Sequence, residues 1–480
     1  MLKEDRLQSR GMPEPRKNFV PIIVAIILAL AAFMLDLWRL ESWHAHAMDM
    51  AWYSQALWLI GQGHWKAYDT MVGYPALADS ASYVLYPIGL LYRFVGQPGI
   101  LLLQILALSS GVIGLSYYFN KYQMRVVDRV GWILLFAFYP AVIGPAIFDW
   151  HPDVMMIPAF FLSIWAFEQR RLGLFILGLV VASATKDVGA AVSAVFGIGL
   201  LLRREGKYGC MALFIGAGTV LLDFLVVMPW IYPHGVAVWP VTYGWLGSSP
   251  LNAVLNVLGH PDILLKAWTR PNVIASWLLL LIGFGIILPF IGAFRTPYGL
   301  PILAVFAFNG LSGFYPQIYA WHQYWIPAVP FLFATSLSVW PSISLRSKWL
   351  IPIVMAGLLL FIFTKSSGQL VSFRQPYSRT LARIARKIPV NAPLIGMNKD
   401  LALLANRPYV SLITTQDLKT SPWGTYAFMD MNDMSNELTS PTNLHYWFRT
   451  LLTSPQWTLV AHQHKIWLFQ KTARQKSHLV

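Results

Sequence analysis

The feature that most limits the fold of this chain is a series of long apolar runs without a charged residue. Residues 99–119, 130–148 and 273–294 are each long enough to cross the ~30 Å hydrocarbon core of a bilayer as a helix. Only 12% of the 480 residues are charged, which is about half the fraction of an ordinary soluble domain. These observations exclude a single water-soluble globule.

The apolar runs predict an α-helical polytopic membrane protein. The first run follows basic residues, as a signal peptide would, but it is long and lacks a small-residue cleavage site, so we interpret it as a retained helix. Membrane helices are expected near residues 18–37, 99–119, 130–148, 154–167, 172–185, 188–202, 209–230, 273–294, 298–315, 325–340 and 349–364.

Basic residues set the expected orientation. If the N-terminus is cytoplasmic, sixteen Lys and Arg fall in inside segments and six in outside loops before residue 365, which is a clear positive-inside bias. The net charge of +15 therefore reflects membrane anchoring, and nucleic acid is not an expected partner. Residues 1–365 are predicted to form the membrane domain, with a long first outer loop at 38–98, and residues 366–480 an extracytoplasmic domain.

The tail reads as a small α/β domain. It begins with an apolar run at 393–397. Strands are expected in the segments 409–414, 457–462 and 465–470, and a helix at 400–405. The membrane domain should place its polar turns on the same side as this tail, because the predicted cytoplasmic loops are short and mostly basic.

Asp49 in the first outer loop is the first candidate for chemistry. It stands at the N-terminal end of a stretch that predicts an interfacial helix. A carboxylate there is commonly an N-cap that accepts backbone N–H bonds. The alternative is a general base at the membrane surface. Spacing alone favours the cap.

The turn at residues 149–153 gathers Asp149, His151 and Asp153 between membrane helices, where polar groups are costly and tend to be functional. One interpretation is a solvated turn in which Pro152 begins the next helix. The other is a divalent metal site, because Asp and His bind such ions. Three ligands on one turn do not by themselves make a site.

Other polar residues interrupt the apolar runs. Lys186 and Asp187 are predicted to split the uncharged stretch 172–202 into two helices, either as a capping ion pair or with Lys186 neutralising a lipid phosphate. Asp223 is an intramembrane carboxylate, which is either functional or a hydrogen-bonded structural residue. His322 and Tyr324 belong to an aromatic cluster that is typical of a membrane-interface belt, although a His there also suits contact with an anionic leaving group.

Four motifs stand out along the chain: MDMAWYSQALW at 48–58, FDWHPD at 148–153, TKDV at 185–188 and WHQY at 321–324. Together they resemble a bacterial multi-spanning membrane family of unknown function, which is similar to the GT-C glycosyltransferases. The resemblance covers nearly the whole chain, and the turn at 148–153 is its most distinctive part. The family pattern often has a second acid where this chain has Ser54.

This resemblance implies an enzyme of the bacterial cytoplasmic membrane that transfers a sugar from a polyprenyl-phosphate donor to a glycan, lipid or protein acceptor at the outer face. An acid in the first outer loop is the catalytic base in that superfamily, and Asp49 is the matching position. Asp149 and His151 are further catalytic candidates. Lys186, His322 and a divalent ion near Asp149 and His151 are candidates to balance the leaving phosphate. The remaining candidates for substrate binding are Asp187, Asp223 and Tyr324. Alternatives are a transporter or flippase of a lipid-linked substrate, and a non-catalytic envelope scaffold.

Overall fold

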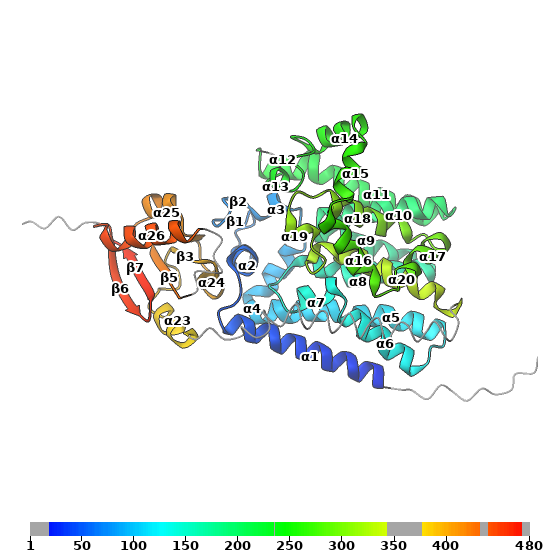
Figure 1. Ribbon diagram of the computed structural model, residues 1–480, viewed down its shortest axis with the longest axis horizontal. Helices are drawn as coiled ribbons and strands as arrows, with labels where there is room; N and C mark the ends of the chain where they lie inside the picture. Colours follow the sequence, from blue (N-terminus) through cyan, green and yellow to red (C-terminus); the bar gives the residue numbers. More distant parts are fainter. Residues whose placement is uncertain (1–18, 235, 343–376, 433–439, 473–480) are drawn as a thin grey trace, which may run out of the picture.

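The structure is a computed structural model, and it describes residues 19–234, 236–342, 377–432 and 440–472. A bundle of helices makes up most of the described chain, and an α/β domain formed by residues 377–472 lies at one end of the bundle (Figure 1). The first described helix, α1 (Val20–Glu41), begins at the opposite end and runs toward the α/β domain.

Three helical segments of the described chain suit a membrane span by length and composition, and the count reaches five if each of two bent helix pairs forms one span. Three are continuous: α1, residues 85–121 and residues 206–231. Two are helix pairs bent at a break, by 60° and 76°. The pairs are α6 (Val126–Ala137) with α7 (Pro140–Ala146), and α16 (Pro271–Ile282) with α17 (Ile287–Arg295).

The rest of the described bundle consists of helices shorter than 18 residues, which are not counted among these spans. The count of eleven spans therefore remains a prediction. The span expected at 99–119 begins earlier, with α4 (Leu85–Ser109), which continues into α5 (Gly111–Lys121) after a kink at Gly96. The helix expected at 349–364 lies outside the described residues. The shorter helices are α8 (Met156–Glu168), α9 (Leu172–Thr185), α10 (Asp187–Leu202), α18 (Gly299–Leu311) and α20 (Val329–Val339).

The connections at residues 122–125, 169–171 and 203–205 carry basic side chains and lie at the end of the bundle far from the α/β domain (Figure 1). We call this end the basic end. Glu168 accepts hydrogen bonds there from Tyr118 and Tyr298, both at 2.8 Å. Arg170 pairs with Glu205 across two connections. The connections predicted to be cytoplasmic thus meet at one end, while the polar turns of the predicted site lie at the other.

The α/β domain is built on a five-stranded sheet of order β4-β3-β5-β7-β6. β3 is parallel to both β4 and β5, whereas the β5–β7 and β7–β6 pairs are antiparallel. Three strands, β4, β6 and β7, agree with the sequence prediction, β3 lies in the apolar run at 393–397, and the fully buried β5 was missed. The strands are β3 (Leu394–Gly396), β4 (Val410–Leu412), β5 (Tyr426–Asp430), β6 (Trp457–Gln463) and β7 (Ile466–Lys471).

Helices cover both faces of this sheet. α23 (Ser378–Ala385) packs on one face, in a buried cluster that also holds Leu394 and Phe428. α26 (Pro441–Thr453) packs on the other face, in a cluster with Ile395 and Phe469. α25 (Thr415–Thr420) lies beside α26 (Figure 1). The first cluster also takes in side chains of the first loop, which joins the domain to the bundle.

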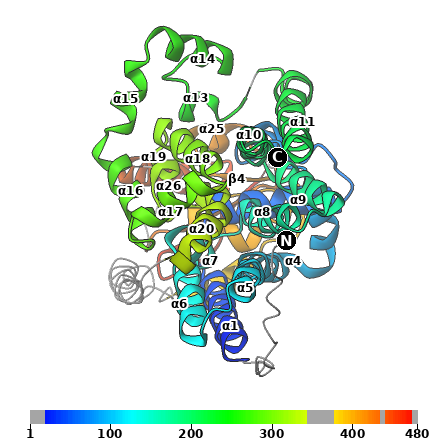
Figure 2. The same ribbon diagram turned by 90° about the vertical axis from the view of Figure 1, so that its right-hand side faces the viewer.

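The first loop after α1 lies between the bundle and the α/β domain. It contains the π-helical turn η1 (Ala47–Ala51), α2 (Trp52–Gly61), the two-residue strands β1 (Tyr68–Asp69) and β2 (Tyr74–Pro75), and α3 (Ala76–Asp79). On the opposite side of the bundle from α1, α14 (Pro250–Gly259) and α15 (Asp262–Trp268) form an arch, which Figure 2 shows in end view.

Candidate active site

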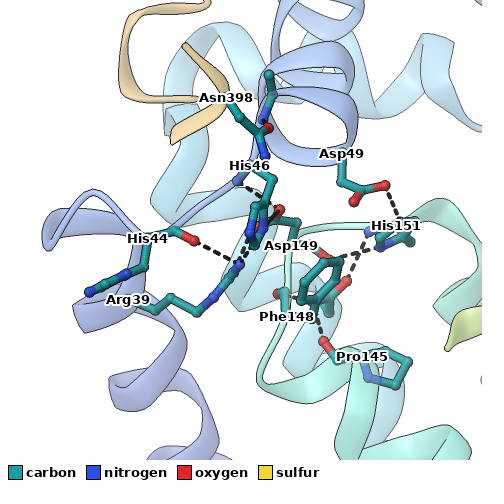
Figure 3. A network of polar contacts seen from close by, with 11 residues as sticks. Arg39, His44, His46, Asp49, Pro145, Phe148, Asp149, His151 and Asn398 are labelled. Atoms are coloured by element: carbon teal, nitrogen blue, oxygen red, sulfur yellow. Dashed lines mark hydrogen bonds and ion pairs between the residues drawn. The ribbon is translucent and has the colours of Figure 1, made fainter. Parts of the chain in front are cut away.

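Asp49 is the third residue of η1, and its carboxylate points away from the backbone of its own helix. Oδ1 lies 3.1 Å from Nε2 of His151 (Figure 3). The N-cap position belongs to His46, which has no side-chain capping bond. The cap interpretation of Asp49 is therefore wrong. The carboxylate instead forms a dyad with His151, and 29% of its side chain is exposed.

Two residues from other parts of the chain take the place of a local N-cap. The amide of His46 donates to Oδ2 of Asp149 at 2.9 Å, and the next amide, that of Ala47, donates to Oδ1 of Asn398 at 2.9 Å. The first N–H groups of a helix have no partner within it. The turn at 149 and the α/β domain satisfy these two, so both fix the start of the helix that carries Asp49.

His151 is buried, and both its ring nitrogens are engaged. Nδ1 lies 2.8 Å from the carbonyl of Asp149. Because a carbonyl only accepts, Nδ1 carries a proton and Nε2 faces Asp49. Burial lowers the pKa of His151, but the hydrogen bond and negative charge of Asp49 outweigh it and raise the pKa above its usual value. The amide of His151 donates to Gln104 at 3.0 Å, which fixes the turn.

Asp149 forms an ion pair with Arg39 of α1 at 2.5 Å. Its Oδ2 also lies 3.2 Å from Nδ1 of His46. Burial raises the pKa of Asp149, but the Arg39 charge and the contacts with His46 hold it well below the usual range. A carboxylate so fully engaged is a poor proton acceptor. Through these contacts Asp149 joins α1, the 149 turn and η1.

Lys186 lies at the break between α9 and α10, as the sequence predicts. Its Nζ is 3.5 Å from Oδ2 of Asp153, which is fully buried, and 5.6 Å from the centre of the Tyr324 ring. Asp187 begins α10, and its Oδ1 lies 2.9 Å from the amide of Val188. The 149–153 turn, the Lys186 break and the 321–324 motif therefore meet at the domain-facing end of the bundle.

Asp79 at the end of α3 belongs to the same charged group and was missed by the sequence analysis. Burial raises its pKa to about 6, against the positive charge of Lys186 and together with the negative charges of Asp187 and Asp153. Just after it, the hydroxyl of Ser82 donates to the carbonyl of Thr185 at 2.6 Å. The amide of Val84 donates to the carbonyl of Ala184 at 3.1 Å. Asp79 stands in no recognisable motif, and only these contacts with the end of α9 reveal it.

Asp223 lies in the π-helical turn η3 (Asp223–Val227), between α11 (Gly206–Leu222) and α12 (Met228–Ile231). Its Oδ1 accepts a hydrogen bond from the hydroxyl of Tyr83 in the first loop, while its buried Oδ2 has no hydrogen-bond partner. Turns of this kind inside α-helices are frequent at functional sites. Asp223 thus faces the first loop.

His322 packs against Phe148, with ring centres 6.3 Å apart. Burial lowers its pKa to about 4, so the imidazole is neutral at pH 7. It can donate a hydrogen bond there but does not supply the positive charge that the sequence analysis expected. A close approach of helix α7 fixes the segment, because a Cβ on Gly144 would lie 1.8 Å from the carbonyl oxygen of Trp321.

The predicted metal site finds no support in this geometry. Asp149 faces Arg39, His151 faces Asp49, and Asp153 faces Lys186, so the three side chains do not converge. Among the residues that the structure describes, no group of three or more His, Cys, Asp or Glu side chains is placed to hold an ion.

Ser54, where the family pattern often has a second acid, is fully buried. Its hydroxyl accepts from Nε2 of Gln97 at 3.0 Å, and the same nitrogen donates to the carbonyl of Ala402 in the α/β domain at 2.5 Å. Ser54 thus contributes to the domain contact.

The comparison that decides the family covers most of the chain. The family described as "Predicted membrane protein (DUF2079)" matches residues 39–461. The chain belongs to this family. The resemblance that the four motifs predict, to a multi-spanning membrane family of unknown function, is confirmed. No curated protein matches the chain.

Two solved structures of ArnT from Cupriavidus metallidurans are similar to this member of the DUF2079 family over nearly their full length. The structure bound to undecaprenyl phosphate has 12% identity and a TM-score of 0.53, and the match covers 95% of this chain and 98% of that one. The apo structure has 13% identity and a TM-score of 0.52, with 93% and 97% covered. At these identities the shared property is the fold, that of a multi-pass membrane protein.

Proposed function

We propose that this protein is a membrane glycosyltransferase, in which Asp49 deprotonates an acceptor that attacks a polyprenyl-phosphate sugar at the outer face of the cytoplasmic membrane. The Asp49–His151 dyad is the observation that carries the proposal. A partly exposed carboxylate held by a buried imidazole is placed to take a proton from a hydroxyl group. The ArnT fold supports the proposal, since the similar structure holds undecaprenyl phosphate, a polyprenyl phosphate.

In the proposed reaction the acceptor oxygen attacks the anomeric carbon of the sugar. The bond between that carbon and the phosphate oxygen breaks, and polyprenyl phosphate leaves with the bonding electrons. The acceptor proton passes to Asp49. His151 keeps the Asp49 carboxylate oriented and, when protonated, stabilises its ionised form through the 3.1 Å contact.

Lys186 is the cation proposed to stabilise the leaving phosphate. Within the described network its ammonium group is held by Asp153 at 3.5 Å and by the face of Tyr324. A phosphate carries more negative charge than one carboxylate and offers more acceptor oxygens, so it would draw the ammonium group away from Asp153. Arg39 is less suitable, because Asp149, His46 and the carbonyl of His44 already engage its guanidinium.

The test is a transfer assay with the full chain in liposomes, using radiolabelled sugars linked to undecaprenyl phosphate and envelope lipids and glycans as acceptors. Label in an acceptor, with release of the polyprenyl phosphate, supports the proposal. Movement of the labelled lipid between leaflets without transfer would replace it with the transporter hypothesis. Absence of both activities across the panel would favour the scaffold.

A further inference from the structure

We propose that Asn398 of the α/β domain is a positioning residue for Asp49, so that the domain forms part of the site; this rests on the proposed function. The bond from the Ala47 amide to Asn398 Oδ1 joins residues 351 positions apart in the chain, and it is buried. Asn398 begins α24 (Asn398–Leu401), which follows β3 directly. The domain thereby supplies the cap that the sequence before Asp49 lacks.

The packing of η1 against the α/β domain also supports a positioning role for the domain. Ala47 and Ala51 lie in the buried cluster that α23 forms with the sheet, together with Leu401 and Phe428. A π-helix has i→i+5 hydrogen bonds, so residues 47 and 51 lie on nearly the same face and residue 49 lies on the opposite one. Docking that face against the domain therefore directs Asp49 toward His151.

Further contacts hold the two parts together without touching η1. The hydroxyl of Tyr92 donates to Oδ1 of Asn406 at 2.6 Å. The hydroxyl of Thr70 donates to the carbonyl of Val410 at 2.7 Å, and the Val410 amide lies 3.0 Å from that hydroxyl oxygen. Asn406 thus provides a matched control, since it is an Asn in the same interface that bonds a different element.

The experiment compares Asn398→Leu, Asn398→Asp and Asn406→Leu in the full chain by hydrogen exchange and by transfer kinetics. Asn398→Leu keeps the side-chain size but loses the acceptor, so exchange at residues 47–52 should rise about tenfold. Its kcat should fall by about 100-fold, with KM nearly unchanged. Asn398→Asp retains an acceptor oxygen and should restore both, and Asn406→Leu should leave exchange at residues 47–52 unchanged.

Unchanged exchange at residues 47–52 in Asn398→Leu would overturn the proposal, as would an equal loss of kcat in Asn398→Asp and Asn398→Leu. Equal changes in Asn406→Leu would show a general weakening of the interface and would also overturn it. Exchange needs no substrate. If the chain transfers no sugar, the exchange result still decides whether Asn398 holds the Asp49 segment.

A separate observation concerns α14, and we infer that this helix lies in the membrane interface with its apolar face in lipid. Leu251, Val254, Leu255 and Leu258 form a stripe at i, i+3, i+4 and i+7, and each is between 56% and 73% exposed. Ala253, on the opposite face, is buried. Ten residues of helix span about 15 Å, which is too short to cross a bilayer but suits an in-plane helix.

Continuity with a span favours lipid over other occupants of this stripe. α15 exposes Leu265, and α16, part of a candidate membrane span, exposes Ile274, Leu278 and Ile282 along one face. The apolar surface thus runs from the span through α15 to α14.

Nitroxide labels on α14 test this inference in nanodiscs of phosphatidylethanolamine and phosphatidylglycerol. Cys210→Ser removes the natural cysteine, and Leu258→Cys and Asn252→Cys place labels on the apolar stripe and on its polar flank. The Leu258 label should be accessible to oxygen and protected from a water-soluble nickel complex. The Asn252 label should be less accessible to oxygen and more accessible to the nickel complex. Equal nickel access at both sites would overturn the inference, as would protection of the Leu258 label from both reagents, which indicates protein contact.

Discussion

His151 Nε2 lies 3.1 Å from Asp49 Oδ1, while its other ring nitrogen is held by the carbonyl of Asp149. The imidazole therefore connects two regions of sequence that lie about a hundred residues apart. Because Nδ1 must donate to a carbonyl, protonation changes only the atom that faces Asp49. The charge of the dyad is thus controlled at one hydrogen bond.

The first prediction concerns the pH dependence of stability. The pKa of His151 is raised in the folded state, so the stability from its pair with Asp49 is complete below the ordinary value of 6.5 and is lost as pH rises through the raised value. Thermal unfolding of wild type and His151→Gln should differ most at pH 5.5 and converge at alkaline pH. The gap at low pH should be about 1.5 kcal/mol, the lower part of the range for hydrogen bonds to charged groups, because Asp49 is partly exposed.

Exposed His64 supplies the control for this series. His64→Gln should leave the unfolding profile unchanged at every pH. A difference in unfolding free energy between wild type and His151→Gln that stays constant from pH 5.5 to 9 would contradict stabilisation by the charged pair.

The second prediction separates the charge of Lys186 from its structural pairing. Lys186→Met leaves the buried Asp153 unpaired, which costs about 3–5 kcal/mol. The double variant Lys186→Met/Asp153→Asn removes both charges and should recover most of that stability. It should still transfer sugar about 100-fold more slowly than wild type, because the cation opposite the leaving phosphate is lost. Recovery of activity together with stability would assign Lys186 a structural role only.

Periodicity and charge predict much of the fold because membrane helices and isolated strands are local features. The break at Lys186 and strands β4, β6 and β7 follow from residues next to one another in sequence. The central strand β5 was missed because all its residues are buried, so it lacks the alternation that marks a half-buried strand. The predicted span began at residue 99 and not at Leu85, because the charged Arg93 interrupts the apolar run within α4.

The site was only half visible in the sequence for a related reason. Asp49 and His151 stand in recognisable motifs. Arg39, which pairs with Asp149, and Asn398, which accepts from the Ala47 amide, come from a membrane helix and a distant domain. No spacing rule links such residues. Spacing also favoured an N-cap for Asp49, and this failed because the caps of η1 are supplied by residues remote in sequence.

The third prediction concerns orientation. The basic end and the α/β domain lie at opposite ends of the bundle, and the positive-inside rule assigns the basic end to the cytoplasm. Alkaline phosphatase, which folds only outside the cytoplasm, should be active when fused after Val480 and inactive when inserted after Gln123 in the α5–α6 connection. Activity at the second site and not at the first would reverse the orientation and move the site to the cytoplasmic face.

The last prediction concerns Asp49 as the base. Asn retains the size of the side chain and can still contact His151, but it cannot take a proton, so Asp49→Asn should lower turnover by ~100-fold or more. Asp49 does not cap its helix, so this substitution removes only the charged contact with His151 and should lower stability by no more than His151→Gln does. Asp262→Asn is the matched control, because Asp262 is an exposed carboxylate that pairs with Lys266 on α15. Transfer is measured in liposomes at equal protein yield and after thermal unfolding has confirmed a folded chain. Wild-type turnover in folded Asp49→Asn protein would exclude Asp49 as the base, and an equal loss in Asp262→Asn would show that the assay reports stability rather than proton transfer.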